Sequence, residues 1–149
     1  MATRSTIALE YADGTVGQVY CHWDGYLENN GMLLYTHYRD PFKLRDLIDC
    51  GDLSSLAPEV GSKHDFDDRS ASGVQCTFYG RDRGEAGTEA KTFKSFEDYV
   101  DNHICEEYEY ILRTDGNWYV KAYSAPYVLL ADELAEHLRE QAEEETLAA

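Results

Sequence analysis

The strongest constraint on the fold is a hairpin pattern near the end of the chain. Residues 107–113 and 118–123 are two runs rich in tyrosine and β-branched or apolar residues, and successive side chains in each run would point to opposite faces of a sheet. The segment between them, Thr114-Asp115-Gly116-Asn117, contains the Asp-Gly pair that tight hairpin turns favour. The pattern therefore predicts two antiparallel strands.

A second hairpin is predicted at the start of the chain. Residues 6–11 alternate between polar and apolar positions, and residues 16–21 form a return run across another Asp-Gly pair, Asp13-Gly14. A further short strand is predicted over residues 74–79. The loop after it, from Gly80 to Glu89, is polar, and residues 52–73 lack periodicity, so both segments are expected to be irregular.

Short helices are predicted between the strands. Residues 32–38 are one candidate, and residues 41–50 are another, with Asp40 as the N-cap and Pro41 at the first helical position. Ser95 is expected to cap a third helix over residues 96–100.

The chain is expected to end in an amphipathic helix that begins at about Pro126. Leu130, Leu134 and Leu138 recur every four residues and form an apolar stripe, with the acidic residues mostly on the other side. Acids at a helix C-terminus oppose the macrodipole, which predicts fraying after about Ala142.

These elements predict an α+β fold in a single domain, residues 1–142, followed by a frayed acidic tail, residues 143–149. The sheet is expected to be antiparallel with about four or five strands. Two or three short helices and the C-terminal helix would accompany it.

The charge of the chain excludes several classes of partner. Lys and Arg number 13 against 29 Asp and Glu, for a formal net charge of −16. Such a chain is not expected to bind nucleic acid directly or to dock on an anionic membrane. The last third, residues 101–149, carries twelve acids and three bases, so −9 of the total lies there.

The termini and cysteines indicate the compartment. The first residues lack the apolar run of a secretory signal, and no apolar stretch is long enough to span a bilayer, so a cytoplasmic location is expected. In that compartment the four cysteines, Cys21, Cys50, Cys76 and Cys105, are expected to be free thiols.

The sequence contains no motif that identifies catalytic chemistry. Cysteines and histidines are scattered without metal-ligand spacing, and His103-x-Cys105 is the only close pair besides the adjacent Cys21-His22, so we expect neither a metal nor another cofactor. No Cys–His signature of a thiol nucleophile and no phosphate-binding glycine loop is present. A non-enzymatic protein is therefore favoured, and no catalytic residue is assigned.

An aromatic stretch and a basic loop form a candidate ligand pocket. Tyrosine and tryptophan suit interfaces and pockets, because each combines apolar area with a polar tip. Arginines of the basic loop would hold a phosphate, although a solvated loop that neutralises nearby acids is the simpler interpretation. The candidate pocket residues are Tyr20, His22, Trp23, Asp24, Tyr26, Arg81 and Arg83.

Three segments carry a resemblance to a known family: Arg4-Ser5-Thr6-Ile7, the run YCHWDGY at residues 20–26, and Gly51 to Leu56. Over about its first 60 residues the chain resembles a family of small uncharacterised proteins of bacteriophages and bacterial mobile elements. The resemblance assigns no site. It implies an accessory protein that acts in the bacterial host cell during infection, where such proteins often disable host defences.

The preferred hypothesis is an inhibitor of a host defence system, of the anti-CRISPR or anti-restriction type. Its carboxylates would occupy the basic nucleic-acid-binding surface of a host protein. A binding protein for a signalling nucleotide is the alternative, and a small enzyme with a pocket that gathers His22, Asp24 and a Cys or Tyr is a third hypothesis. The Leu/Ala stripe could instead form a homodimer seam. The expected partner-binding residues are Asp132, Glu133, Glu136, Glu140, Glu143 and Glu144, with Glu145 beside them.

Overall fold

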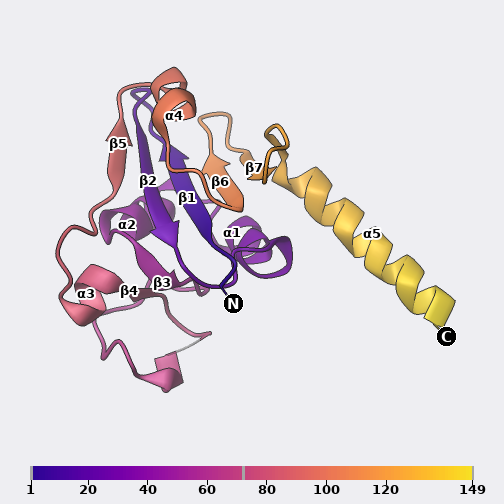
Figure 1. Ribbon diagram of the computed structural model, residues 1–149, viewed down its shortest axis with the longest axis horizontal. Helices are drawn as coiled ribbons and strands as arrows, with labels where there is room; N and C mark the ends of the chain where they lie inside the picture. The colour runs from indigo at the N-terminus through magenta and orange to yellow at the C-terminus, as the bar shows by residue number, and fades with distance from the viewer. Residues whose placement is uncertain (1, 72, 149) are drawn as a thin grey trace.

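A computed structural model describes residues 2–71 and 73–148 of the chain and shows an α+β domain built on a mixed sheet (Figure 1). Within those residues the α-helices are α1 (Met32–His37), α2 (Pro41–Asp49), α3 (Tyr79–Arg83), α4 (Phe96–Asn102) and α5 (Leu130–Ala148), and a π-helical turn, η1 (Leu27–Gly31), and a 3₁₀ turn, η2 (Arg69–Ala71), accompany them. The strands are β1 (Ser5–Glu10), β2 (Val16–Cys21), β3 (Leu53–Ser55), β4 (Thr77–Phe78), β5 (Lys91–Phe93), β6 (Tyr108–Leu112), β7 (Trp118–Ala122) and β8 (Val128–Leu129).

Both predicted hairpins are confirmed and form the centre of the sheet. β1 pairs with β2, and β6 pairs with β7, each antiparallel. The two hairpins join through β1 and β6, which run parallel with Ile7 opposite Tyr110. The strand order is β4-β3-β2-β1-β6-β7-β8, and β5 also pairs with β2.

The predicted antiparallel sheet of four or five strands is therefore wrong in strand direction and in number. The described residues form eight strands, and the β1–β6 and β2–β3 pairings are parallel. Each parallel pair joins segments far apart in the chain, so no local turn signal announces it. β3, β4, β5 and β8 have only two or three residues each, too few to show an alternating pattern.

One face of the sheet carries the main core. Ile7 and Leu9 of β1 point to it, together with Tyr110 and Leu112 of β6. Helices α1 and α2 cover this face, and the first turns of α5 close it at one side. The helices bury the following side chains in this core: Leu34 of α1 and its C-cap Tyr38, Leu44, Leu47 and Ile48 of α2, and Leu130 and Leu134 of α5.

The opposite face is smaller and more polar. Its apolar cluster contains Ala8, Val16, Phe93, Tyr99 and Ile111, and α4 packs over it through Tyr99. Three polar side chains are also buried on this side, Thr6, Gln18 and Glu109. The Gln18 amide bonds both backbone groups of Ile104 at 3.0 Å, which holds the segment after α4 against the sheet.

The predicted helix starts are largely confirmed. Asp40 caps α2 by accepting a hydrogen bond from the Phe42 N–H at 2.9 Å, and Ser95 caps α4 by accepting from the Asp98 N–H at 3.0 Å. The C-terminal helix begins at Leu130 rather than at about Pro126, because Val128 and Leu129 first pair with β7 as β8.

Some local predictions differ from the structure. The strand expected over residues 74–79 is reduced to β4, because Tyr79 already begins α3, which lies in the segment expected to be a loop. α5 is helical through Ala148, so the predicted tail is helical up to that residue, and residue 149 lies outside the described residues. Fraying of this segment in solution stays a prediction.

All four cysteines are free, as predicted. Cys21 and Cys76 are buried, Cys50 is half-buried and Cys105 is exposed. Of the helices within the described residues, none combines the length and apolarity needed to cross a bilayer.

Candidate functional site

Helix α5 is anchored to the domain only by its first two turns. Leu130 and Leu134 are buried in the main core, and His137 Nε2 lies 2.8 Å from Glu28 Oε1. Every residue from Leu138 to Leu147 is exposed. The rest of α5 extends away from the body of the molecule as a long arm, drawn in yellow in Figure 1.

Helix α5 as a whole, its anchored turns and the arm together, carries the densest run of carboxylates in the chain. Residues 130–148 contain seven acids and one base, Arg139. Acids at positions 132, 136, 140, 143 and 144 follow the three- and four-residue spacing that places side chains on one face of a helix. Like charges at this spacing repel, by about 0.2–0.5 kcal/mol for each pair, so a cationic partner would relieve a repulsion built into the helix.

The expected partner-binding residues thus lie on one element, but their exposure differs. Asp132, Glu136, Glu140, Glu143 and Glu144 are exposed. Glu133 is half-buried and lines a small pocket of about 110 Å³ with Leu27 and Val120.

An apolar stripe runs along the arm beside the acids. It continues from the buried Leu134 to Leu138, which is 52% exposed, and to Ala142. A homodimer through this stripe stays a prediction.

The structure brings together only part of the aromatic stretch at residues 20–26. The Tyr20 hydroxyl hydrogen-bonds His22 Nδ1 at 2.7 Å, and the His22 ring meets the Trp23 ring edge-on with centroids 4.7 Å apart. Trp23 and Asp24 line a pocket of about 500 Å³ with Phe66, Asp67 and others. Tyr20, His22 and Tyr26 are not among the residues that line it.

Arg81 is held by the protein itself and does not face that pocket. Four of the five guanidinium donors are used: Nε bonds Asp82, Nη1 bonds the carbonyls of Val60 and Gly61, and Nη2 bonds the carbonyl of Cys76. This arginine joins the loop around residue 60 to α3, which gives it a structural role.

Arg83 is also engaged, but at the surface. Its Nη2 donates to Glu85 Oε2 at 2.6 Å, and its guanidinium lies 4.4 Å from the centroid of the Phe66 ring. Among the described residues, neither Arg81 nor Arg83 lines a pocket with Trp23, so the predicted ligand site is not gathered in one place.

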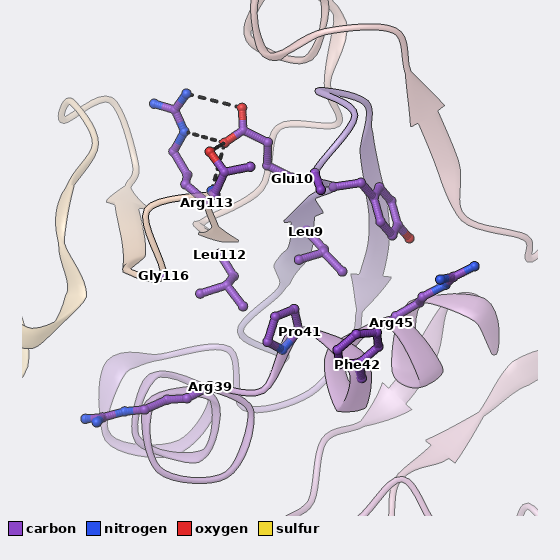
Figure 2. A pocket seen from close by; sticks show the side chains of 12 residues that line it. Leu9, Glu10, Arg39, Pro41, Phe42, Arg45, Leu112, Arg113 and Gly116 are labelled. Atoms are coloured by element: carbon purple, nitrogen blue, oxygen red, sulfur yellow. Dashed lines mark hydrogen bonds and ion pairs between the residues drawn. The ribbon is translucent and has the colours of Figure 1, made fainter.

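A different pocket, which the sequence pattern does not reveal, lies where the two hairpin turns meet α2 (Figure 2). It encloses about 500 Å³ and its lining is mainly apolar. Leu9 and Leu112 form its floor and Pro41 and Phe42 one wall, and Phe42 is 74% exposed. Three arginines lie at its rim: Arg39, Arg45 and Arg113. In the sequence, the only signal of this pocket is that two of these arginines flank Pro41 and Phe42.

The three rim arginines differ in the contacts that hold their guanidinium groups. Arg113 donates to the Glu10 carboxylate from Nε at 3.1 Å and from Nη2 at 3.3 Å. Burial raises the pKa of Glu10, but its hydrogen bonds with Arg113 and the Thr114 N–H outweigh this effect and hold the pKa below its usual value. Arg39 lies over the Tyr35 ring, whereas Arg45 makes no ion pair with any described residue.

The third hypothesis, a small enzyme, would need a pocket that gathers His22, Asp24 and a Cys or Tyr. The hydrogen-bond partner that the described residues provide for the His22 ring is the Tyr20 hydroxyl. Asp24 lies on the Trp23 pocket, and its backbone is left-handed with φ of 57°.

Side chains of the kinds that bind metal ions lie together on the polar face of the sheet. His103, Cys105 and Glu109 place one donor atom each within 4.8 Å of one another, although the spacing of these residues in the chain favours no metal site.

Comparison with known proteins finds no match: the chain matches no family model, no curated protein and no solved structure.

Proposed function

We propose that this chain is a non-enzymatic binding protein whose α5 arm occupies the basic, nucleic-acid-binding surface of another protein. The observation that carries the proposal is an arm in which every residue from Leu138 to Leu147 is exposed, on a helix with seven acids and one base. A partner of opposite charge would gain from these carboxylates and would relieve their mutual repulsion.

The charge density of α5 supports a comparison with nucleic acid. Seven acids between residues 132 and 145 occupy about 20 Å of helix axis at about 1.5 Å per residue. That amounts to one carboxylate per about 3 Å, against one phosphate per about 3.4 Å along each strand of DNA. A groove that neutralises a phosphate backbone would find a similar linear density of charge on α5.

The biological setting in this proposal rests on the resemblance to bacteriophage and mobile-element proteins. In that setting the partner is a host defence protein with a basic channel, such as a CRISPR effector or a restriction enzyme. Occupation of the channel would prevent the host protein from binding nucleic acid.

The test compares two variants with equal charge. One, the arm variant, neutralises four exposed acids of α5, three of them on the arm: Glu136→Gln, Glu140→Gln, Glu143→Gln and Glu144→Gln. The control neutralises four exposed acids elsewhere: Asp46→Asn, Asp49→Asn, Glu89→Gln and Asp101→Asn. Each protein is immobilised, incubated with nuclease-treated bacterial lysate at low and at raised salt, and the captured proteins are assayed for DNA binding.

The expected result is capture of a basic DNA-binding protein by the natural chain and by the control variant, weakening as salt rises. The arm variant should lose the capture, and the free natural chain should displace DNA from the captured protein. Loss of capture in both variants alike would show that total charge, not α5, is responsible, and would refute the proposal. So would the absence of any basic protein at low salt.

A truncation separates binding from folding. Deletion of residues 139–149 removes side chains that are exposed wherever the structure describes them, so the free energy of unfolding should change by less than about 0.5 kcal/mol. Leu134→Ala, which empties a buried position at the base of α5, should cost about 2–4 kcal/mol. A truncated chain that remains folded but no longer captures the partner would assign binding to the arm.

The Arg-rimmed pocket supports a second candidate function, the binding of a small anion with an apolar body. Such a ligand would place its apolar part on Leu9, Leu112 and Phe42 and its charge toward Arg45. A signalling nucleotide, the alternative expected from the sequence, has this amphipathic character.

A thermal-shift screen with cyclic nucleotides tests this second candidate. A ligand at 100 times its dissociation constant should stabilise the fold by about 2.7 kcal/mol, and Arg45→Ala should remove the shift. Arg83→Ala, a substitution at an arginine outside this pocket, is the control. If no cyclic nucleotide raises the melting temperature, the candidate is rejected for this class.

A further inference from the structure

Three different metal-ligand types meet on the polar face of the sheet. His103 is the C-cap that follows α4, Cys105 lies in the loop after it and Glu109 lies on β6. His103 Nε2 is 2.6 Å from Glu109 Oε1 and 3.8 Å from Cys105 Sγ. The imidazole and the carboxylate are buried, with 7% and 1% of the side chain exposed, whereas Cys105 is exposed at the mouth of the cluster.

The other nitrogen of His103 is fixed. Nδ1 lies 2.8 Å from the Tyr99 carbonyl oxygen and 3.1 Å from that of Val100. A carbonyl oxygen only accepts hydrogen bonds, so Nδ1 is the donor and the ring directs Nε2 toward the cluster. Metal-binding histidines are oriented in this way by a backbone carbonyl on the second nitrogen.

This geometry does not suit a thiol nucleophile. A catalytic triad places the nucleophile on one imidazole nitrogen and the orienting carboxylate on the other. Here Cys105 and Glu109 both approach Nε2, and a backbone carbonyl occupies Nδ1. Three donor atoms within 4.8 Å of one another, two of them beside the same imidazole nitrogen, are instead an arrangement that a shared metal ion could use.

The carboxylate has its own supporting contacts. Tyr127 donates its hydroxyl hydrogen bond to Glu109 Oε1 at 2.8 Å, and the Tyr99 hydroxyl lies 3.0 Å from that of Tyr127. On β1, the residue opposite Glu109 is Thr6, whose buried hydroxyl has no hydrogen-bond partner among the described residues. The sheet therefore presents buried polar groups here that apolar packing alone does not explain.

We propose that His103 Nε2, Cys105 Sγ and a Glu109 carboxylate oxygen bind one zinc ion, with water as the fourth ligand on the exposed Cys105 side. Zinc accepts nitrogen, sulfur and oxygen ligands together, and a thiolate and a carboxylate balance its double charge. This site lies on the face covered by α4 and is independent of the α5 arm.

The Nε2–Sγ distance is close to that between two ligands of a tetrahedral site, whereas the carboxylate would have to shift to complete it. With bonds of about 2.1 Å to nitrogen and about 2.3 Å to sulfur, two ligands on zinc lie about 3.6 Å apart. Nε2 and Sγ are 3.8 Å apart in this structure. The Nε2–Oε1 contact would open from 2.6 Å to about 3.3 Å as the ion enters between the two atoms.

The experiment uses the full chain, reduced and stripped of metal with a chelator, and titrates it first with Co²⁺ and then with Zn²⁺. The natural chain should bind one Co²⁺ with thiolate-to-cobalt charge-transfer absorption, which Zn²⁺ should abolish by displacement. Cys105→Ser should remove that absorption and weaken Zn²⁺ binding by at least about tenfold. Because Cys105 is exposed, this variant keeps the fold.

Matched controls locate the ion. Cys50→Ser and His137→Gln should leave the absorption unchanged. Tyr127→Phe should weaken Zn²⁺ binding about tenfold, because it removes the hydrogen bond to the ligand carboxylate, and Tyr119→Phe should have no effect. Failure of the natural chain to bind Co²⁺ stoichiometrically, or a thiolate absorption that survives Cys105→Ser, would overturn the proposal.

Discussion

Glu10 and Arg113 join the ends of the two hairpins, although 103 residues separate them in the chain. Arg113 Nε donates to Glu10 Oε1 at 3.1 Å and Nη2 donates to Oε2 at 3.3 Å. The Thr114 N–H donates to the same carboxylate. The pair therefore closes the parallel β1–β6 junction at the end where the strands leave the sheet, beside the Arg-rimmed pocket.

Removal of this carboxylate should weaken the junction. Glu10→Gln is expected to lower the free energy of unfolding by about 1 kcal/mol, since the arginine side of the pair is partly solvated. Urea unfolding measures the change. Glu85→Gln, which breaks the equally direct but exposed Arg83–Glu85 pair, should change stability by less than about 0.5 kcal/mol. Equal losses in the two variants would contradict a structural role for Glu10.

The Asp82 carboxylate should make part of the free energy of unfolding depend on pH. Burial raises the pKa of its carboxyl, but hydrogen bonds from Arg81 and from the N–H groups of Phe78 and His64 outweigh it and hold the pKa below the usual 3.8. Folding thus favours the carboxylate, whose contribution is complete above pH 3.8 and is lost as pH falls through the lower folded value.

The variant Asp82→Asn tests this dependence. At neutral pH it should lower the free energy of unfolding by about 3 kcal/mol, because Arg81 loses its buried partner. The difference from the natural chain should shrink as pH falls below 3.8, measured by urea unfolding over a pH series. A difference that is constant across the series would exclude the carboxylate as its cause.

Two glycines with the same backbone geometry should respond differently to alanine. Gly51 and Gly116 have φ of 84° and 83°, a region that costs an L-residue about 1–2 kcal/mol. A Cβ at Gly116 would enter open space, whereas one at Gly51 would collide with the Thr88 carbonyl oxygen. Gly51→Ala should therefore cost about 1–3 kcal/mol more than Gly116→Ala in chemical unfolding. Equal losses of stability in the two variants would contradict this prediction, since they would mean that the Thr88 loop moves aside without cost.

The four thiols should react in an order set by burial. Burial raises the pKa of Cys21 to about 12 and also raises that of Cys76. With a disulfide thiol reagent on the folded, metal-free chain, the exposed Cys105 should react first and Cys50 second, and the two buried thiols only on unfolding. Cys105→Ser should remove the fast phase, and a fast phase that persists in this variant would contradict the order.

The elements that the residue pattern predicts well are those with local causes. The two hairpins have Asp-Gly turns and alternating strands, and the caps Asp40 and Ser95 bond backbone groups within three residues. Each of these interactions is short-range along the chain, so the signal lies in a short window of sequence.

The parallel pairing of β1 with β6 had no such signal. Its register, Ser5 opposite Tyr108 through Leu9 opposite Leu112, depends on which buried faces fit together after the hairpins form. The same holds for the polar side of the sheet. His103 and Glu109 are near neighbours in the chain, but only the packing of α4 through Tyr99 turns Nε2 toward the carboxylate.

Charge and composition established that acids concentrate in the last third of the chain and that α5 carries most of them, because charge is a property of the residues alone. Tertiary packing settled where that helix leaves the domain. Leu130 and Leu134 are buried in the core, whereas Leu138, one turn further along the helix, is exposed. The exposure of the arm, the Arg-rimmed pocket and the orientation of the His103–Cys105–Glu109 cluster depend on tertiary packing, which no local pattern of residues encodes.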